Sequence, residues 1–189
     1  NRPSTVIIGG AKVSTKILVI TEMMKKADNI IIGGGMAYTF VKAMGGNVGS
    51  SMVENDKLDV ALKVIREAIE NGVRLVLTKD IIVADNFSND ANMDICSIND
   101  IKEGWMGMDI GPETCRIFSD IIKESKTIMW NGPVGAFEFP NFSKGTECVA
   151  KAIVEATQKG SFSLVGGGDL VGALKMYNLL NKVSYVSTG

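Results

Sequence analysis

Two lysines stand four residues apart directly after a pair of glycines, in the segment VIIGGAKVSTK at residues 6–16. The apolar run before the glycines is typical of a strand, and the residues after them are typical of a helix start. Side chains at positions i and i+4 of a helix share one face, so Lys12 and Lys16 would project together. Each cation opposes the helix dipole by roughly 0.3–1 kcal/mol, a cost that a bound anion would offset. Two solvated surface lysines are the alternative interpretation.

A single carboxylate follows another glycine cluster near the end of the sequence. Asp169 comes directly after LVGGG, where a further helix is expected to begin. An N-cap role, worth about 1 kcal/mol, would be a sufficient reason for an aspartate there. Beside a bound phosphate, however, a carboxylate would repel the ligand unless a cation lay between them. Mg²⁺ commonly bridges one or two protein carboxylates and phosphate oxygens, so Asp169 is also a candidate magnesium ligand.

A third candidate loop is WNGPVGAFEF at residues 130–139, which could be an ordinary turn with Glu138 on the surface. The familiar phosphate motifs are not met. G-x-x-x-x-G-K-[ST] is missing, and G-x-G-x-x-G fails at Tyr38 and at Val171. The chain has no histidine, which excludes a Ser-His-Asp triad and an H-E-x-x-H zinc site within it. Lysines, a carboxylate and glycine-rich loops instead suit phosphoryl transfer, which requires no histidine.

Short apolar runs that alternate with helical patterns must position these groups. The runs are uniformly apolar, as expected for strands covered on both faces of a parallel sheet, and occupy residues 6–8, 30–32, 75–77 with 81–84, 128–130, 161–165 and 183–186. Helices are predicted at residues 14–27, 56–71 and 142–159 and from residue 111 onward. Residues 86–107 are expected to be irregular, with an inserted pair of turns.

This pattern predicts one α/β domain over residues 1–189. Its expected architecture is a doubly wound, Rossmann-like, mostly parallel six-stranded sheet with helices on both faces. Every glycine cluster follows an apolar run, so all clusters are expected at the carboxyl edge of the sheet. Ligands of such folds bind at that edge.

Composition narrows the partners and the compartment. The formal net charge of −1 gives no reason to expect nucleic acid or an anionic membrane as partner. No apolar run reaches the roughly 18 residues of a membrane span. The opening NRPST does not resemble a signal peptide, so a cytoplasmic protein is expected. Cys96, Cys115 and Cys148 are widely spaced without a C-x-x-C pair and are interpreted as reduced thiols, mostly core filler.

Six blocks of the sequence together resemble one known family. They are GGAKVSTK, IIGGGMAYTF, WMGMDIGP, WNGPVGAFEFPNFSKGT, GGGD and VSYVSTG. In this order they are similar to the C-terminal, nucleotide-binding domain of phosphoglycerate kinases, over nearly the whole chain from Arg2 to Gly189. The resemblance implies the glycolytic phosphotransferase that moves a phosphoryl group between 1,3-bisphosphoglycerate and Mg-ADP, giving 3-phosphoglycerate and ATP.

The resemblance also implies roles for individual residues. Lys16 would hold the transferred phosphoryl group, Lys12 would lie along the nucleotide phosphates and Asp169 would hold Mg²⁺, which makes these three the predicted catalytic residues. Glu138 would hydrogen-bond the ribose hydroxyls. The residues implied to contact ADP or ATP are Gly10, Ala11, Lys12, Lys16, Gly34, Gly35, Gly107, Met108, Asn131, Pro133, Gly135, Ala136, Glu138, Gly167, Gly168, Asp169 and Leu170.

The chain has three main departures from the family pattern, besides minor ones at Ala136 and Thr78-Lys79. Leu170 follows GGGD where the family usually has Ser or Thr, and the sequence ends at Gly189 where the family continues as STGGGAS. None of its residues matches the basic N-terminal domain that binds phosphoglycerate in the family. We therefore expect a monomeric chain that binds Mg-ADP or Mg-ATP but does not turn over alone. The alternatives are a non-catalytic nucleotide-binding module that needs the missing lobe and, less favoured, a dinucleotide-dependent oxidoreductase.

Overall fold

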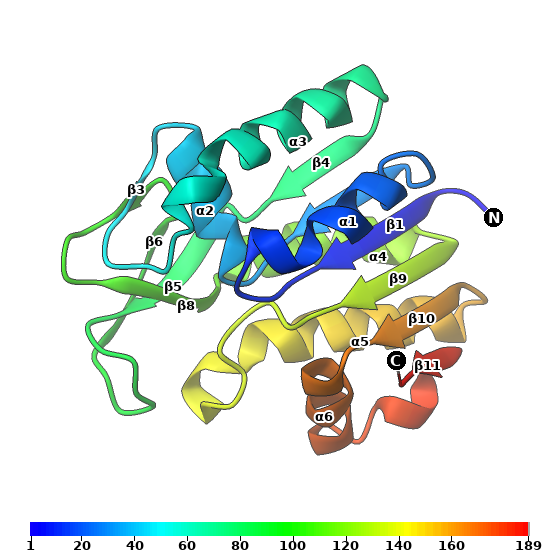
Figure 1. The fold of residues 1–189 in the computed structure, drawn as a ribbon. Coiled ribbons are helices and arrows are strands. Elements are labelled where there is room, and N and C mark those ends of the chain that lie inside the picture. The colour runs from blue at the N-terminus through cyan, green and yellow to red at the C-terminus, as the bar shows by residue number, and fades with distance from the viewer. Residues whose placement is uncertain (189) are drawn as a thin grey trace.

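The main sheet is entirely parallel, with the N-terminal strand near its centre. A computed structural model describes residues 1–188, so Gly189, the last residue of the VSYVSTG block, lies outside the described residues. The strand order is β11-β10-β9-β1-β2-β4 (Figure 1). The strands are β1 (Ser4–Ile8), β2 (Asn29–Ile32), β4 (Arg74–Leu77), β9 (Thr127–Asn131), β10 (Phe162–Gly166) and β11 (Tyr185–Ser187). The predicted fold class is confirmed.

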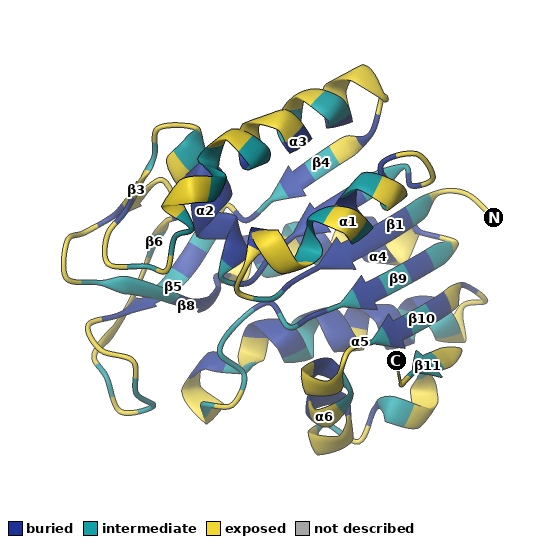
Figure 2. Cartoon of the chain, in the orientation of Figure 1, coloured by how far each residue is buried: buried dark blue, intermediate teal, exposed yellow. Residues whose placement is uncertain are grey.

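Helices cover both faces of this sheet. One face carries α1 (Val13–Met23), α2 (Met36–Ala43) and α3 (Leu58–Glu70). The other carries α4 (Pro112–Glu124), α5 (Lys144–Gln158) and α6 (Gly168–Met176). Ile8 and Ile32 belong to the first core cluster, whereas Ile7 and Ile31 belong to the second. Because successive strand residues point to opposite faces, a sheet covered on both sides requires uniformly apolar strands, and Figure 2 shows the buried strands between the helices.

A second, antiparallel sheet corrects the prediction for residues 81–107. Its strands, in the order β6-β5-β8, are β5 (Asp80–Ala84), β6 (Met93–Ser97) and β8 (Met106–Ile110). Residues 81–84 were expected to run with 75–77, and residues 86–107 were expected to be irregular. Where the chain leaves the main sheet, Thr114 accepts the N–H groups of Lys79 and Asp80, at 3.0 Å each. Four of the five residues of β6 are exposed, so this strand lacks an apolar pattern.

Smaller differences concern the ends and lengths of elements. Helix α1 ends at Met23 rather than at residue 27, and β11 lies at 185–187 rather than at 183–186. Helix α2 was not predicted. Its residues 36–41 are all buried, so it lacks the alternation of polar and apolar faces that marks a surface helix.

Short elements complete the fold. They are the strand pair β3 (Asn47–Val48) and β7 (Asp100–Ile101) and the 3₁₀ turns Asn55–Lys57, Pro140–Phe142 and Leu180–Lys182. None of the helices in residues 1–188 has the length and apolar character needed to cross a bilayer.

Candidate functional site

The glycine-rich loops meet at the carboxyl edge of the main sheet and are bonded to one another. The N–H of Gly9 donates to the carbonyl of Asn131 at 2.8 Å, and that of Gly10 donates to Pro133 at 3.0 Å. A Cβ at Gly34 would lie 2.7 Å from the carbonyl oxygen of Gly10, closer than any real Cβ contact. Gly34 also has a φ of 71°, which glycine adopts without strain. Glycines are therefore required for these loops to pack together.

A cavity of about 470 Å³ opens beside the joined loops. Its volume falls within the range of small-molecule sites. Many of the residues implied by the family resemblance line it: Gly10, Ala11, Gly34, Gly35, Gly107, Met108, Pro133, Gly135, Ala136, Glu138 and Asp169. Other lining residues were not predicted: Tyr38, Ser50, Met52, Phe87, Met106, Val134 and Phe137.

The antiparallel sheet supplies one wall of this cavity. Met106, Gly107 and Met108 belong to β8, and Phe87 lies in the loop between β5 and β6. Phe87 is 58% exposed, although it is a large apolar side chain. It stands alone in the polar run DNFSNDAN at residues 85–92, a signal that could have identified it. The carbonyl of Met108 accepts the N–H of Ala136 at 2.8 Å, which joins this wall to the loop after β9.

Lys16 turns back across the first glycine loop toward the end of β9. Its Cε would lie 3.2 Å from a Cβ at Gly10, so a side chain there would obstruct it. Its ammonium group donates a hydrogen bond to the side-chain oxygen of Asn131. Burial lowers the pKa of Lys16, and the charge of Asp169 acts in the opposite direction. The structure thus brings a lysine of α1, an amide at the end of β9 and a carboxylate at the start of α6 to one place.

The start of α6 offers unbonded N–H groups at this place. Gly167, with a φ of 100°, precedes the helix, and a Cβ there would lie 3.5 Å from the Asn131 side-chain nitrogen. Within residues 1–188, the N–H groups of Gly168, Asp169 and Leu170 donate to no protein acceptor. Such N–H groups and the helix dipole favour an anion. The Leu170 side chain is fully buried in the core, so only its backbone remains available to a ligand.

Lys12 differs from Lys16 in its surroundings, which corrects the expectation of a shared helix face. Lys12 is the extended N-cap residue of α1 and is exposed. The N–H of Ser14 donates to the carboxylate of Glu54 at 3.1 Å, and Thr39 accepts the N–H of Glu54 at 3.2 Å. The anion at the start of α1 is therefore a side chain of the protein itself.

Burial and hydrogen-bonding partners have opposite effects on the pKa of the Glu54 carboxylate. Burial raises its pKa, but hydrogen bonds from Ser14 and Val13 and the charge of Lys12 bring the pKa below its ordinary value. No local sequence pattern marks this contact, because Glu54 lies 40 residues from Ser14 along the chain.

A fully buried carboxylate supports the loops from behind. One oxygen of Asp109 accepts the N–H of Gly145 at 2.8 Å, and the other accepts that of Ile110 at 2.9 Å. A Cβ at Gly135 would lie 2.2 Å from Asp109 Oδ1, so the carboxylate packs directly against the cavity loop. Burial raises the pKa of Asp109 to about 8, although the two backbone hydrogen bonds act in the opposite direction.

The side chains at this place suit a metal ion that is coordinated jointly by the protein and a bound ligand, rather than one held by protein side chains alone. No group of three or more Cys, Asp or Glu side chains within residues 1–188 could hold a metal ion. Asp169 is exposed and lines the cavity beside the free N–H groups of α6. One carboxylate beside an anion site matches the way Mg²⁺ binds through phosphate oxygens and a single acidic residue.

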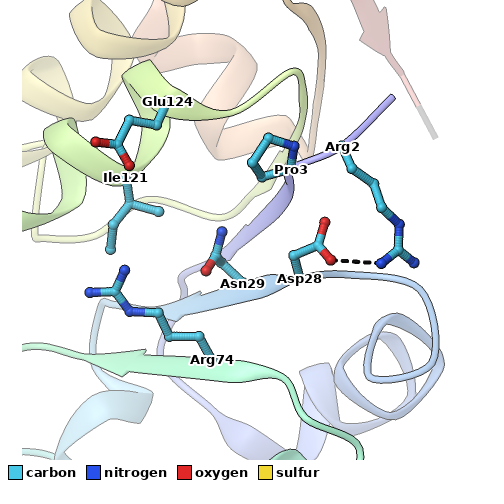
Figure 3. A pocket seen from close by; sticks show the side chains of 7 residues that line it. All are labelled: Arg2, Pro3, Asp28, Asn29, Arg74, Ile121 and Glu124. Atoms are coloured by element: carbon cyan, nitrogen blue, oxygen red, sulfur yellow. Dashed lines mark hydrogen bonds and ion pairs between the residues drawn. The ribbon is translucent and has the colours of Figure 1, made fainter.

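A second hollow lies at the opposite edge of the sheet. It measures about 480 Å³ and is lined by Arg2, Pro3, Asp28, Asn29, Arg74, Ile121 and Glu124 (Figure 3). Arg2 forms an ion pair with Asp28 at 2.8 Å. Asn29 and Arg74 begin their strands, so this hollow lies at the amino ends, away from the edge where parallel sheets bind ligands.

Comparison with known proteins gives one consistent family. The family model described as phosphoglycerate kinase matches residues 1–189. Curated relatives named phosphoglycerate kinase include those of Porphyromonas gingivalis, 56% identical, and Rippkaea orientalis, 49% identical. Both matches include the whole of this chain but only 45% and 47% of those proteins, so the chain spans about half the length of these relatives.

A solved structure agrees with these relatives. The phosphoglycerate kinase from Coxiella burnetii has a TM-score of 0.96 and 41% identity, over all of this chain and 48% of that one. The Pyrococcus horikoshii structure, at 24% identity and a TM-score of 0.83, shows the shared fold.

Proposed function

Because this chain belongs to the phosphoglycerate kinase family, we propose that it binds Mg-ADP and Mg-ATP as the nucleotide-binding half of that phosphotransferase. The observation that carries the proposal is the convergence of Lys16, Asn131 and the open start of α6 beside the glycine-lined cavity. We also propose that the protein is cytoplasmic and monomeric, and that a second domain holds 1,3-bisphosphoglycerate or 3-phosphoglycerate.

The cavity suits the base and the sugar of a nucleotide. Gly34, Gly35 and Gly107 place no side chain on the cavity wall, and Met108 and Phe87 add apolar surface for a planar ring. Glu138 lies at the exposed rim, where its carboxylate could accept hydrogen bonds from both ribose hydroxyls. Because apolar side chains and backbone would make most contacts with the base, the cavity would discriminate between bases by their shape more than by their hydrogen-bonding groups.

The phosphates would lie between α1 and α6. The start of α1 already has the Glu54 carboxylate, whereas the N–H groups at 168–170 have no protein acceptor within the described residues. A polyphosphate would therefore bind at α6, with the ammonium of Lys16 on its other side. Asp169 would hold Mg²⁺ against the same phosphates, and the ion would neutralise charge on the group being transferred. Lys12 is exposed and would act on the phosphates at longer range.

The chemical role of Lys16 follows from its partial burial. Burial destabilises an isolated ammonium, so its pKa is lowered in the free protein. Negative charge that develops on the phosphoryl oxygens in the transition state would compensate this cost. If Lys16 contacts the oxygens on which this charge develops, it would stabilise the transition state more than the bound nucleotide, which is the requirement for catalysis.

Titration calorimetry of the 189-residue chain with ADP, with and without Mg²⁺, tests the proposal. We expect a Kd in the micromolar to millimolar range that rises when Mg²⁺ is withheld, and no comparable binding of NAD. Tighter binding of NAD than of ADP would contradict it. A coupled assay of ATP consumption, with and without the N-terminal domain of a relative added as a separate chain, tests transfer. Turnover is expected only in the mixture.

A further inference from the structure

Two of the three cysteines, Cys115 in α4 and Cys148 in α5, lie close together where these helices pack, although the sequence separates them by 33 residues. The Cys148 Sγ is 3.7 Å from the carbonyl oxygen of Cys115 and 3.4 Å from the Ser119 hydroxyl. Both cysteines are partly exposed. They are free thiols, as expected, and Cys115 packs against the core, whereas Cys148 belongs to none of the core clusters.

The surroundings of Cys148 favour its thiolate. It lines an open hollow of about 430 Å³ together with Lys123, Lys144 and Lys151. Glu155 and Glu147 line the same hollow and pair with Lys123 and Lys151, at 3.1 Å each. A hydrogen bond from the Cys115 thiol is the main cause that lowers the pKa of Cys148 to about 6, and the charges of Lys123 and Lys151 act in the same direction. Accessible thiols whose pKa is lowered by neighbouring donors and cations are the reactive ones.

The surroundings of Cys115 disfavour its thiolate, so Cys115 has a different role from Cys148 in the proposed reaction. Its hydrogen bond to Cys148 and its own burial raise the pKa of its thiol, and the nearby carboxylates of Asp109 and Asp80 raise it further. Of the two thiols it is therefore the one that is harder to deprotonate. An attacking cysteine with a protonated second cysteine next to it is the arrangement of reversible thiol oxidation.

The geometry points to a peroxide-sensitive modification site in which Cys148 is oxidised first and Cys115 then closes a disulfide between α4 and α5. The Cys148 sulfur attacks the peroxide, so an S–O bond forms, the O–O bond breaks and hydroxide leaves, to be protonated to water. Cys148 becomes a sulfenic acid and the peroxide is reduced. The Cys115 sulfur attacks this sulfenic sulfur, so the S–S bond forms and the S–O bond breaks. The Cys115 proton leaves with the second water, and two thiols and one peroxide give one disulfide and two waters.

This disulfide would join two helices that begin just after the loops of the cavity. Helix α4 follows β8, which holds Gly107 and Met108, and α5 follows the loop from Asn131 to Glu138. Asp109 touches both regions, because it binds the N–H of Gly145 in α5 and lies in β8 itself. The site is thus part of the scaffold behind the cavity and does not depend on nucleotide binding for its chemistry.

Cys96 provides a matched control within the same chain. It is also partly exposed, but burial and the carboxylates of Asp94 and Asp100 raise its pKa. Alkylation of the reduced protein with iodoacetamide across pH 5–10, read by peptide mass spectrometry, should give a midpoint for Cys148 well below that of Cys96. A midpoint for Cys148 equal to or above that of Cys96 would overturn the assignment of Cys148 as the attacking thiol.

Hydrogen peroxide then tests the disulfide itself. Stoichiometric peroxide should yield a Cys115–Cys148 cross-linked peptide that dithiothreitol releases, and Cys96→Ser should form it at the same rate. In Cys115→Ser the reaction should stop at a Cys148 sulfenic acid that dimedone traps. In Cys148→Ser the loss of Cys115 thiol should be several-fold slower. Oxidation of Cys96 as fast as Cys148, or no intramolecular cross-link in the folded wild-type chain, would refute the proposal.

Discussion

The Lys16 ammonium group is hydrogen-bonded to the side-chain oxygen of Asn131, a residue 115 positions away at the end of β9. This contact holds the lysine across Gly10 and beside the charge of Asp169. The proposed phosphate site therefore exists before any ligand binds, in the sense that its cation is already oriented. Preorganised charge of this kind is the main source of catalysis in phosphoryl transfer.

Replacing the lysine should separate binding from transfer. In the chain complemented by an N-terminal domain, Lys16→Ala should lower kcat by about 100-fold or more, while the Kd for Mg-ADP changes less than about fivefold. The difference arises because the ammonium acts mainly on charge that develops during transfer. Rapid kinetics and calorimetry measure the two quantities. Lys25→Ala, at an exposed lysine near the other end of α1, should change neither, and equal losses in kcat and affinity would assign Lys16 to ground-state binding.

Removing the rim carboxylate should affect only nucleotides that carry ribose hydroxyls. Glu138→Ala should weaken ADP binding by about three- to tenfold, since it removes charge-assisted hydrogen bonds at an exposed position. Binding of 2′,3′-dideoxy-ADP should stay the same in both proteins. Calorimetry with ADP and with 2′,3′-dideoxy-ADP on both proteins measures how much of the lost affinity depends on the ribose hydroxyls. A similar loss for the dideoxy nucleotide would show that Glu138 does not contact the sugar.

Adding one methyl group to the cavity wall should disturb both stability and binding. A Cβ at Gly107 would lie 2.0 Å from the Tyr38 hydroxyl, which is held in the core. Gly107→Ala should therefore lower the free energy of unfolding by roughly 1–3 kcal/mol and weaken ADP binding, as urea denaturation and calorimetry would show. Gly168→Ala is the matched control, because no atom lies within 4 Å of its Cβ position, and its unfolding free energy should stay within about 0.5 kcal/mol.

The buried carboxylate should make stability fall as pH rises. Because the pKa of Asp109 is about 8 in the folded protein and 3.8 without burial, the folded state binds the proton more tightly between these values. Its contribution to stability is complete below the unfolded pKa and declines toward pH 8, by at most about 1.4 kcal/mol per pH unit. Urea unfolding at several pH values should show this slope in wild type and a flatter profile in Asp109→Asn. An identical slope in the variant would rule out Asp109 as its source.

The Glu54 carboxylate at the start of α1 should have the opposite effect on the pH dependence of stability. The folded-state pKa of Glu54 lies below its ordinary value, so its stabilising contribution is present above the unfolded pKa and is lost as pH falls through the folded one. Glu54→Gln should lower the free energy of unfolding at pH 7 by roughly 0.5–2 kcal/mol, as expected for loss of a helix cap. The deficit should shrink in acid. Glu103→Gln, at an exposed position away from α1, should be neutral at both pH values.

Much of the fold could be predicted from local pattern. Uniformly apolar runs such as residues 6–8 and 30–32 predicted a parallel sheet, because only strands buried on both faces can be apolar throughout. The glycine clusters after these runs predicted the edge at which the cavity lies. The second sheet escaped prediction, because β6 is mostly exposed and carries no apolar pattern.

The sequence by itself determined the strands of the main sheet, the glycine-rich loops and the residue types available for binding, since each depends on neighbours along the chain. Only the tertiary structure decided which of these side chains meet. It placed Glu54 at the start of α1, Phe87 in the cavity wall and Cys148 beside Cys115. Each of these contacts joins segments that are far apart in the sequence. Such contacts depend on how helices and loops pack on the sheet, which no local spacing of residues specifies.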